Sequence, residues 1–195
     1  MQIVGADAVV ARLSLTGELG YEINVPVSHQ LALHEALTAA GRNLGLRSIG
    51  NRALDSLRLE KSYGIWNSEF TQSCTPGMSN LAQHVAFDKG DFIGRDAALR
   101  EREAGADKTL VTLLIDATDA DASGFEPVKR NGRLVGSVTS GAYGHFVKQS
   151  LALAYIDRDI ATAALELTVD VIGEARPAKI LPEPAYDPKG LRLRS

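Results

Sequence analysis

The stretch that decides the fold of the N-terminal half is Thr16-Gly17-Glu18-Leu19-Gly20-Tyr21-Glu22. Its two glycines bracket a turn in which the backbone can approach a ligand closely, because glycine has no Cβ atom. The turn leads into an alternating segment, residues 21–25, which places Glu22 on one face of a strand. We therefore expect strands at 7–14 and 20–25 to lie side by side around this turn.

A second informative stretch is Arg52-Ala53-Leu54-Asp55-Ser56-Leu57-Arg58-Leu59-Glu60-Lys61. Its spacing predicts a helix over about 52–62, capped by Asn51 and ended by Gly64. The stripe of this helix consists of Leu54, Leu57 and Lys61, with Arg58 beside it. Two other helices are expected, one from Ser28 as N-cap to about Leu44 with Gly45 as its stop, and one over about 95–103.

The pattern changes after the charged segment 100–108, which lacks large apolar residues and predicts a domain boundary. Short strands with turns between them follow, and Asn131-Gly132 predicts a tight hairpin. The expected strands are 109–116, 126–130, 133–139, 149–156, 165–172 and 175–181. The predicted fold is α+β: the later part of an α/β region over 1–105, then an antiparallel β-barrel over 109–195 that ends in a proline-rich extended tail.

Composition narrows the classes of function. The chain has 195 residues and a formal net charge of −3, with lysine and arginine scattered, so nucleic acid is not an expected partner. Cys74 is the single cysteine and no apolar run reaches 18 residues, which favours a cytoplasmic protein without a membrane span. Neither metal-ligand spacing nor a nucleophile or nucleotide-binding motif occurs, so we expect no metal and no nucleophilic catalysis.

Glu22 is the main candidate for ligand binding. A carboxylate can accept two parallel N–H bonds from an amino-pyrimidinone ring, as it does from a guanidinium group, and a pterin presents that edge. Tyr21 precedes it and is a second candidate. The alternative is that Glu22 is an ordinary strand carboxylate facing water.

Four other side chains are candidates for contacts with the same ligand. Trp66, the only tryptophan, could stack on a flat ring or belong to the core. Arg52 and Arg58 could hold a carboxylate tail, although Arg58 could instead form an ion pair within or between helices. His145 follows a glycine-rich stretch and could lie at the lip of a barrel over the site.

With both motifs in view, the chain resembles the aminomethyltransferase family. This family includes the T protein of the glycine cleavage system and the folate-binding C-terminal parts of dimethylglycine and sarcosine dehydrogenases. The resemblance covers nearly the whole chain, and it is stronger to the dehydrogenase branch than to the glycine cleavage branch, because Trp66 follows the Arg-Ala-Leu-Asp-Ser-Leu-Arg form. The other landmarks are Asp88-Lys89-Gly90-Asp91-Phe92-Ile93-Gly94-Arg95, Thr139-Ser140-Gly141-Ala142-Tyr143-Gly144, Ser150-Leu151-Ala152-Leu153-Ala154-Tyr155 and Tyr186-Asp187-Pro188.

The resemblance implies binding of tetrahydrofolate, with Glu22 on the pterin, and transfer of a one-carbon unit from a small-molecule donor. The family's catalytic aspartate lies upstream of the Thr-Gly-Glu motif, so we expect no catalytic residue within this chain. Activity then requires a partner chain or a larger enzyme that supplies the missing half. Uncovered apolar faces also predict a homo-oligomer or a partner chain.

Several positions depart from the family pattern and leave two other functions open. Leu15 stands in place of a tyrosine, Leu54 lies near the position of a ligand-binding arginine, and Met78 stands in place of a glutamate. Asn67-Ser68 also replaces a Gly-Asp pair. The alternatives are a non-catalytic scaffold subunit that keeps the fold, and a folate-dependent demethylase acting on an O- or S-methyl donor.

Overall fold

The computed structural model describes residues 1–161 and 166–194. The N-terminal elements are β1 (Gln2–Ile3), β2 (Ala6–Asp7), β3 (Val9–Ala11), β4 (Glu22–Asn24), the 3-10 turn η1 (Val27–His29), α1 (Gln30–Gly41), η2 (Arg42–Leu44), α2 (Asn51–Glu60), η3 (Ala82–His84) and α3 (Arg95–Ala104). The C-terminal elements are β5 (Lys108–Ile115), β6 (Pro127–Arg130), β7 (Arg133–Gly144), β8 (Gln149–Asp157), η4 (Arg158–Ile160), β9 (Leu167–Val171), β10 (Glu174–Leu181) and η5 (Arg192–Arg194).

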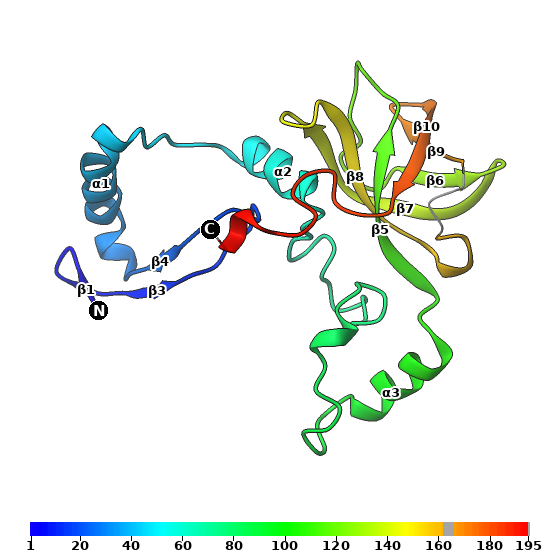
Figure 1. Cartoon of the computed structure of the whole chain (residues 1–195), viewed down its shortest axis with the longest axis horizontal. Coiled ribbons are helices and arrows are strands. Elements are labelled where there is room, and N and C mark those ends of the chain that lie inside the picture. The colour runs from blue at the N-terminus through cyan, green and yellow to red at the C-terminus, as the bar shows by residue number, and fades with distance from the viewer. Residues whose placement is uncertain (162–165, 195) are drawn as a thin grey trace.

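Strands β5 to β10 form a closed antiparallel barrel in the order β10-β5-β8-β7-β6-β9 (Figure 1). The hairpin between β6 and β7 turns at Asn131 and Gly132, both of which have a positive φ, as a tight two-residue turn requires. Register shifts within the β6–β7 and β7–β8 pairs bend the strands, which helps the sheet to close. The α+β class and the C-terminal barrel are therefore confirmed.

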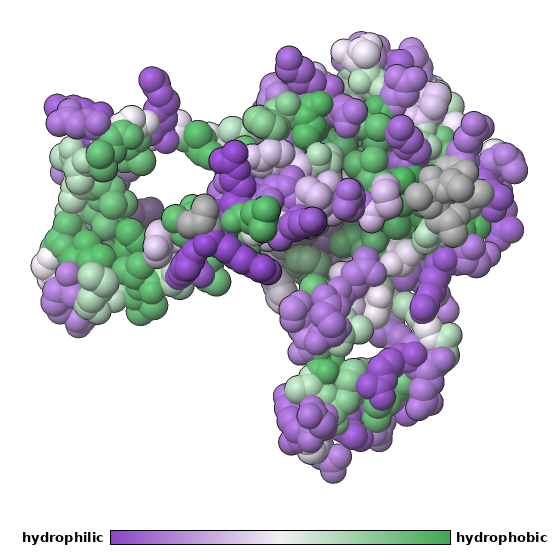
Figure 2. Space-filling view, viewed as in Figure 1, coloured by the Kyte–Doolittle hydropathy of each residue, from purple (hydrophilic) through white to green (hydrophobic). Residues whose placement is uncertain are grey.

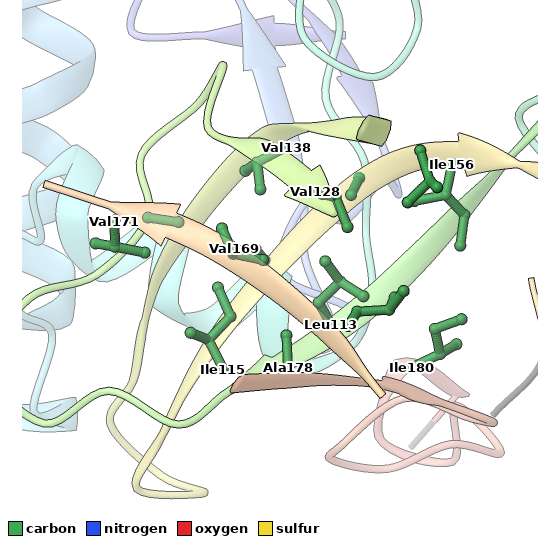
Figure 3. Packing of buried hydrophobic residues seen from close by; sticks show 14 of the residues in the cluster. Leu113, Ile115, Val128, Val138, Ile156, Val169, Val171, Ala178 and Ile180 are labelled. Carbon is green, nitrogen blue, oxygen red and sulfur yellow. The ribbon is translucent and has the colours of Figure 1, made fainter. Parts of the chain in front are cut away.

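The barrel interior is filled by aliphatic side chains from every strand (Figure 3). Alternation along each strand produces this filling. In β9, for example, Leu167, Val169 and Val171 are buried, whereas the residues between them are half-buried. Leu113 of β5 and Val128 of β6 are fully buried in the same cluster. All residues of this cluster come from the C-terminal half of the chain.

The N-terminal half contains two short hairpins and α1. Strands β3 and β4 pair antiparallel across the Thr16–Gly20 loop, with Ala11 opposite Glu22, which confirms that the two expected strands pair. Helix α1 buries only Leu33. Both hydrophobic clusters found among the described residues lie at the barrel, so this half has no comparable core.

Large apolar side chains are consequently exposed on the N-terminal half. Val27 and Leu44 are each 86% exposed, and Leu31 is 68% exposed. In Figure 2 hydrophobic residues gather along the middle of this lobe, with hydrophilic residues at its top and bottom, and an opening separates much of the lobe from the barrel. Exposed apolar area of this kind is typical of a surface that another chain or segment covers.

The helix boundaries differ in detail from those expected. Ser28 does not cap α1, because a 3-10 turn occupies Val27–His29 and the helix begins after His29. Helix α2 ends at Glu60, four residues before Gly64. Gly45 does end the α1–η2 segment, with a φ of 78°.

The strand predicted at 165–172 corresponds to β9, which begins at Leu167; residue 165 lies outside the described residues.

No helix in the described part of the chain has the length and hydrophobicity needed to cross a bilayer.

The barrel core predicts a contrast between two leucine-to-alanine substitutions. Leu113→Ala removes a fully buried side chain and should lower the free energy of unfolding by about 2–5 kcal/mol. Leu134→Ala, at a position on β7 that is 61% exposed, should change it by about 0.5 kcal/mol or less. Urea unfolding followed by circular dichroism measures both, and equal losses would contradict the described core.

Candidate functional site

Helix α2 packs against the outside of the barrel through a face that was expected only in part. Leu59 is fully buried against Leu151 and Leu153 of β8, whereas Leu57 is 37% exposed. The predicted stripe is therefore wrong at Leu57 only, because Lys61 and the neighbouring Arg58 are buried. The contact face also includes Leu59, which the predicted stripe omitted.

Arg58 of α2 is held in an internal ion pair. Its side chain is 2% exposed, and Nε donates to Oδ1 of Asp55 at 2.8 Å. Nη1 donates to the carbonyl oxygen of Tyr63 at 3.1 Å and lies 3.7 Å from Oε2 of Glu69. The guanidinium group is thus engaged by the protein itself, which agrees with the ion-pair alternative for Arg58.

Glu69 links the loop after α2 to the barrel. It is fully buried, and its Oε1 accepts hydrogen bonds from the hydroxyl groups of Thr139 (2.5 Å) and Ser140 (2.6 Å) on β7. Its Oε2 accepts the backbone N–H of Ile65 at 2.8 Å. The Tyr155 hydroxyl, whose pKa is raised by burial, donates to the backbone carbonyl of Glu69 at 2.9 Å. These bonds fix the loop on both sides of Trp66.

Trp66 lies at the tip of this fixed loop and is 77% exposed. The core alternative for Trp66 is therefore wrong. Asn67, which follows it, has a φ of 70° and completes the tight turn. The loop presents a rigid, flat aromatic surface to the outside, as a stacking contact requires.

Glu60 and Ser56 connect α2 to the β7–β8 turn. Glu60 is 1% exposed, and its Oε1 accepts the backbone N–H of Phe146 at 2.7 Å. Ser56 Oγ accepts the backbone N–H of His145 at 3.0 Å. The His145 side chain is exposed and packs edge-on against Tyr143, with ring centroids 5.1 Å apart. The structure thus places His145 next to α2, at the surface.

Lys61, the C-cap residue of α2, connects both ends of the chain. Its Nζ donates to the carbonyl oxygen of Gly17 at 2.5 Å and lies 2.8 Å from Oε1 of Glu18. On the other side it donates to Oδ2 of Asp187 at 3.1 Å. The Lys61 side chain is 4% exposed.

The protonation states of this cluster follow from these contacts. Burial alone lowers the pKa of Lys61, but its hydrogen bonds to Glu18 and Asp187 outweigh burial and raise the pKa above its ordinary 10.5. Burial alone raises the pKa of Asp187, but the N–H groups of Leu191 and Arg192, together with Lys61, lower it below 3.8. The Lys61 ammonium group and the Asp187 carboxylate are therefore both charged between pH 3.8 and pH 10.5.

Glu22 begins the strand that follows the loop held by Lys61, and Tyr21 directly precedes it. Tyr21 is 61% exposed, and Glu22 is exposed at the start of β4. No hydrogen bond or ion pair to the Glu22 carboxylate occurs within residues 1–161 and 166–194. The carboxylate is therefore available to a ligand.

The six predicted residues fall into separate groups. Glu22 and Tyr21 share the N-terminal hairpin, whereas Arg58 and the Trp66 loop share the Glu69 network. Arg52 is exposed on the first turn of α2, and His145 borders the same helix. A hollow of about 850 Å³ on the barrel, between the β6–β7 hairpin and the ends of β5, β9 and β10, includes none of the six.

The sequence analysis did not identify the charged contacts of three residues that organise this region. Glu69 stood in a loop without a recognised motif, and Asp187 appeared only within the Tyr-Asp-Pro landmark. Lys61 was assigned to the stripe of the helix. One feature of the sequence could have indicated buried charges here. Charged residues stand on both sides of Leu59, at Arg58, Glu60 and Lys61.

Comparison with known proteins gives a consistent family. Residues 1–89 match the GCVT N-terminal domain, and residues 108–187 match the glycine cleavage T-protein C-terminal barrel domain. The chain is 32% identical over 185 residues to the mitochondrial dimethylglycine dehydrogenase of Homo sapiens, covering 94% of this chain and 21% of that protein. It is 32% identical over 186 residues to the aminomethyltransferase of Caldanaerobacter subterraneus, and this match covers 95% of this chain and 50% of that protein.

A solved structure shares the fold. The glycine cleavage system aminomethyltransferase T from Bartonella henselae superposes with a TM-score of 0.82 at 26% sequence identity, covering 92% of this chain and 50% of that one. The chain therefore spans about half the length of the aminomethyltransferases it matches and about a fifth of the dehydrogenase. With two matched domains that together cover most of its length, the chain belongs to the aminomethyltransferase family of the glycine cleavage T protein.

Proposed function

We propose that this chain is a tetrahydrofolate-binding module for one-carbon transfer, acting as a portion or a subunit of a larger enzyme. The observation that carries the proposal is the exposed, unpaired carboxylate of Glu22 at the end of a loop whose conformation is fixed. Such a carboxylate can accept the two N–H groups of a pterin edge. Family membership supports the ligand class.

The other exposed candidates suit the remaining parts of such a ligand. The flat surface of Trp66 and the phenol ring of Tyr21 can stack on an aromatic ring, and Arg52 can pair with a carboxylate tail. His145 can contribute from the barrel side. Arg58 is engaged by Asp55, so we assign it a supporting role behind the Trp66 loop.

When bound, tetrahydrofolate would accept the one-carbon unit. The residues of this chain would bind and orient it: Glu22 would hold the pterin edge, and the aromatic side chains would shield one ring face from water. We assign no catalytic acid or base within this chain. The chain spans half of its aminomethyltransferase relatives, so we propose that the remaining half of the family fold supplies those groups.

The pterin assignment predicts a specific loss of affinity. Glu22→Gln replaces one acceptor oxygen with a donor, which repels a pterin N–H, and should weaken tetrahydrofolate binding by about 30- to 150-fold, or about 2–3 kcal/mol. Glu35→Gln, at a position on α1 that is also exposed, is the matched control and should leave affinity unchanged. Calorimetric titration, with Trp66 fluorescence as a second signal, measures both.

Two outcomes would overturn this assignment. Equal affinities for the wild type and Glu22→Gln would remove Glu22 from the site. No measurable binding by the wild type would show that this chain does not hold the pterin by itself and would favour the scaffold alternative.

We also propose that the exposed apolar surface of the N-terminal half is the contact surface for the missing half of the family fold. This half of the chain has little core of its own, and Val9, Val27, Leu31 and Leu44 are largely exposed. The aminomethyltransferase relative extends beyond the matched region by about as many residues again, which is sufficient for a domain that would cover them. A second copy of the chain is the competing occupant.

The uncovered surface predicts self-association when the chain is purified alone. Light scattering should detect oligomers whose mass increases with concentration, because apolar area exposed on both copies can be buried between them. The double variant Val27→Ser/Leu31→Ser should shift the population toward monomer. Phe125→Ser, at a position on the barrel that is 95% exposed, is the control and should leave the oligomer population unchanged. A monodisperse wild-type monomer would contradict the expected self-association and exclude a second copy as the occupant of this surface.

A further inference from the structure

The C-terminal tail leaves the barrel and returns to the N-terminal hairpin. In Figure 1 the segment after β10 runs past α2, and η5 ends beside the strand ends of β3 and β4. On its way, the backbone N–H of Tyr186 donates to the carbonyl oxygen of Glu60 at 2.8 Å. The C-terminal tail is therefore in direct contact with the end of α2.

The Lys61 ammonium group joins this tail to the Thr16–Glu22 loop. Its acceptors are the Gly17 carbonyl and the Glu18 carboxylate from the loop, and the Asp187 carboxylate from the tail. An ammonium group has three N–H donors, so these acceptors can satisfy it completely. Because the side chain is 4% exposed, water cannot easily replace a lost partner.

Asp187 also shapes the tail itself. Its Oδ1 accepts the N–H of Leu191 at 2.9 Å, and its Oδ2 accepts the N–H of Arg192 at 3.1 Å. One carboxylate thus closes the turn of the tail and binds Lys61. Loss of its charge would weaken both contacts together.

A second contact fastens the far end of the tail to the strand before the loop. Nη2 of Arg12 donates to the carbonyl oxygen of Leu193 at 3.2 Å. Together with Gly20, these residues border a hollow of about 350 Å³ between the tail and the loop. The tail is therefore joined to the N-terminal hairpin at two places, directly through Arg12 and indirectly through Lys61.

The loop is fitted closely to Lys61. Gly17 has a φ of 72°, and a Cβ atom at this position would lie 2.3 Å from Cδ of Lys61. Only glycine satisfies both the backbone conformation and the close approach of the lysine stem. The glycine of the Thr-Gly-Glu motif is thus explained by packing against Lys61.

We propose that Lys61 and Asp187 are positioning residues for the ligand site and that the tail, residues 186–193, clamps the Thr16–Glu22 loop so that Glu22 is presented in a fixed orientation. The link to ligand affinity rests on the proposed function, whereas the clamp itself does not. Neither residue touches the ligand. They act by restricting the loop, which lowers the entropy lost on binding.

The test uses three variants of the full chain. Lys61→Met keeps the length of the stem and removes the charge, and Asp187→Asn removes the charge of the tail partner. The third variant combines both substitutions. Lys179→Met and Asp159→Asn, at exposed positions on β10 and η4, are the matched controls.

Two readouts are measured on each variant. Hydrogen exchange of the amides of residues 14–22 should become about tenfold faster in both single variants, while β5 and β8 amides stay unchanged. Tetrahydrofolate affinity should fall about tenfold in each single variant. The double variant should lose little more affinity than either single variant, because both substitutions break the same contact between Lys61 and Asp187. The controls should match the wild type in both readouts.

The outcomes separate this proposal from the proposed function. Unchanged loop exchange in Asp187→Asn would overturn the clamp, even if Lys61→Met failed to fold. Faster loop exchange with unchanged affinity, in a wild type that binds, would overturn the positioning role. If the wild type bound no tetrahydrofolate, the proposed function would fail, and the exchange data would still decide whether the clamp exists.

Discussion

The buried charged groups at the end of α2 are the constraint on which the rest of the structure depends. Arg58, Glu60 and Lys61 are each 4% exposed or less, and a buried charge without partners is strongly destabilising. Each charge therefore requires partners, and apart from local ones such as Asp55 for Arg58, these come from other parts of the chain. The positions of those partners determine how the separate segments assemble around one short helix.

Each of these groups organises a different segment. Arg58 and Glu69 fix the loop that carries Trp66, and Glu60 fixes the turn that carries His145. Lys61 fixes the loop before Glu22 and holds the tail. The residues proposed to contact a ligand are thus supported by a shared internal network, and a change at α2 is expected to affect several parts of the site together.

The sequence predicted the parts that depend on local pattern. Alternation of apolar residues and the Asn131-Gly132 turn predicted the barrel, because strand period and turn chemistry act over a few residues. The buried face of α2 was not predictable in this way, because its charges are satisfied by distant partners such as Asp187, 126 positions from Lys61. The exposure of Trp66 was not predictable for the same reason. The loop that carries Trp66 is held by bonds from Glu69 to β7, and these residues are far apart in the sequence.

The most direct test of Glu22 as the pterin ligand is a crystal structure of this chain, alone or with the missing half, bound to tetrahydrofolate. We expect the amino-pyrimidinone edge within hydrogen-bond distance of both Glu22 carboxylate oxygens, with the Thr16–Glu22 loop still held by Lys61. Density for the pterin elsewhere, for example in the hollow on the barrel, with Glu22 facing solvent, would contradict the assignment.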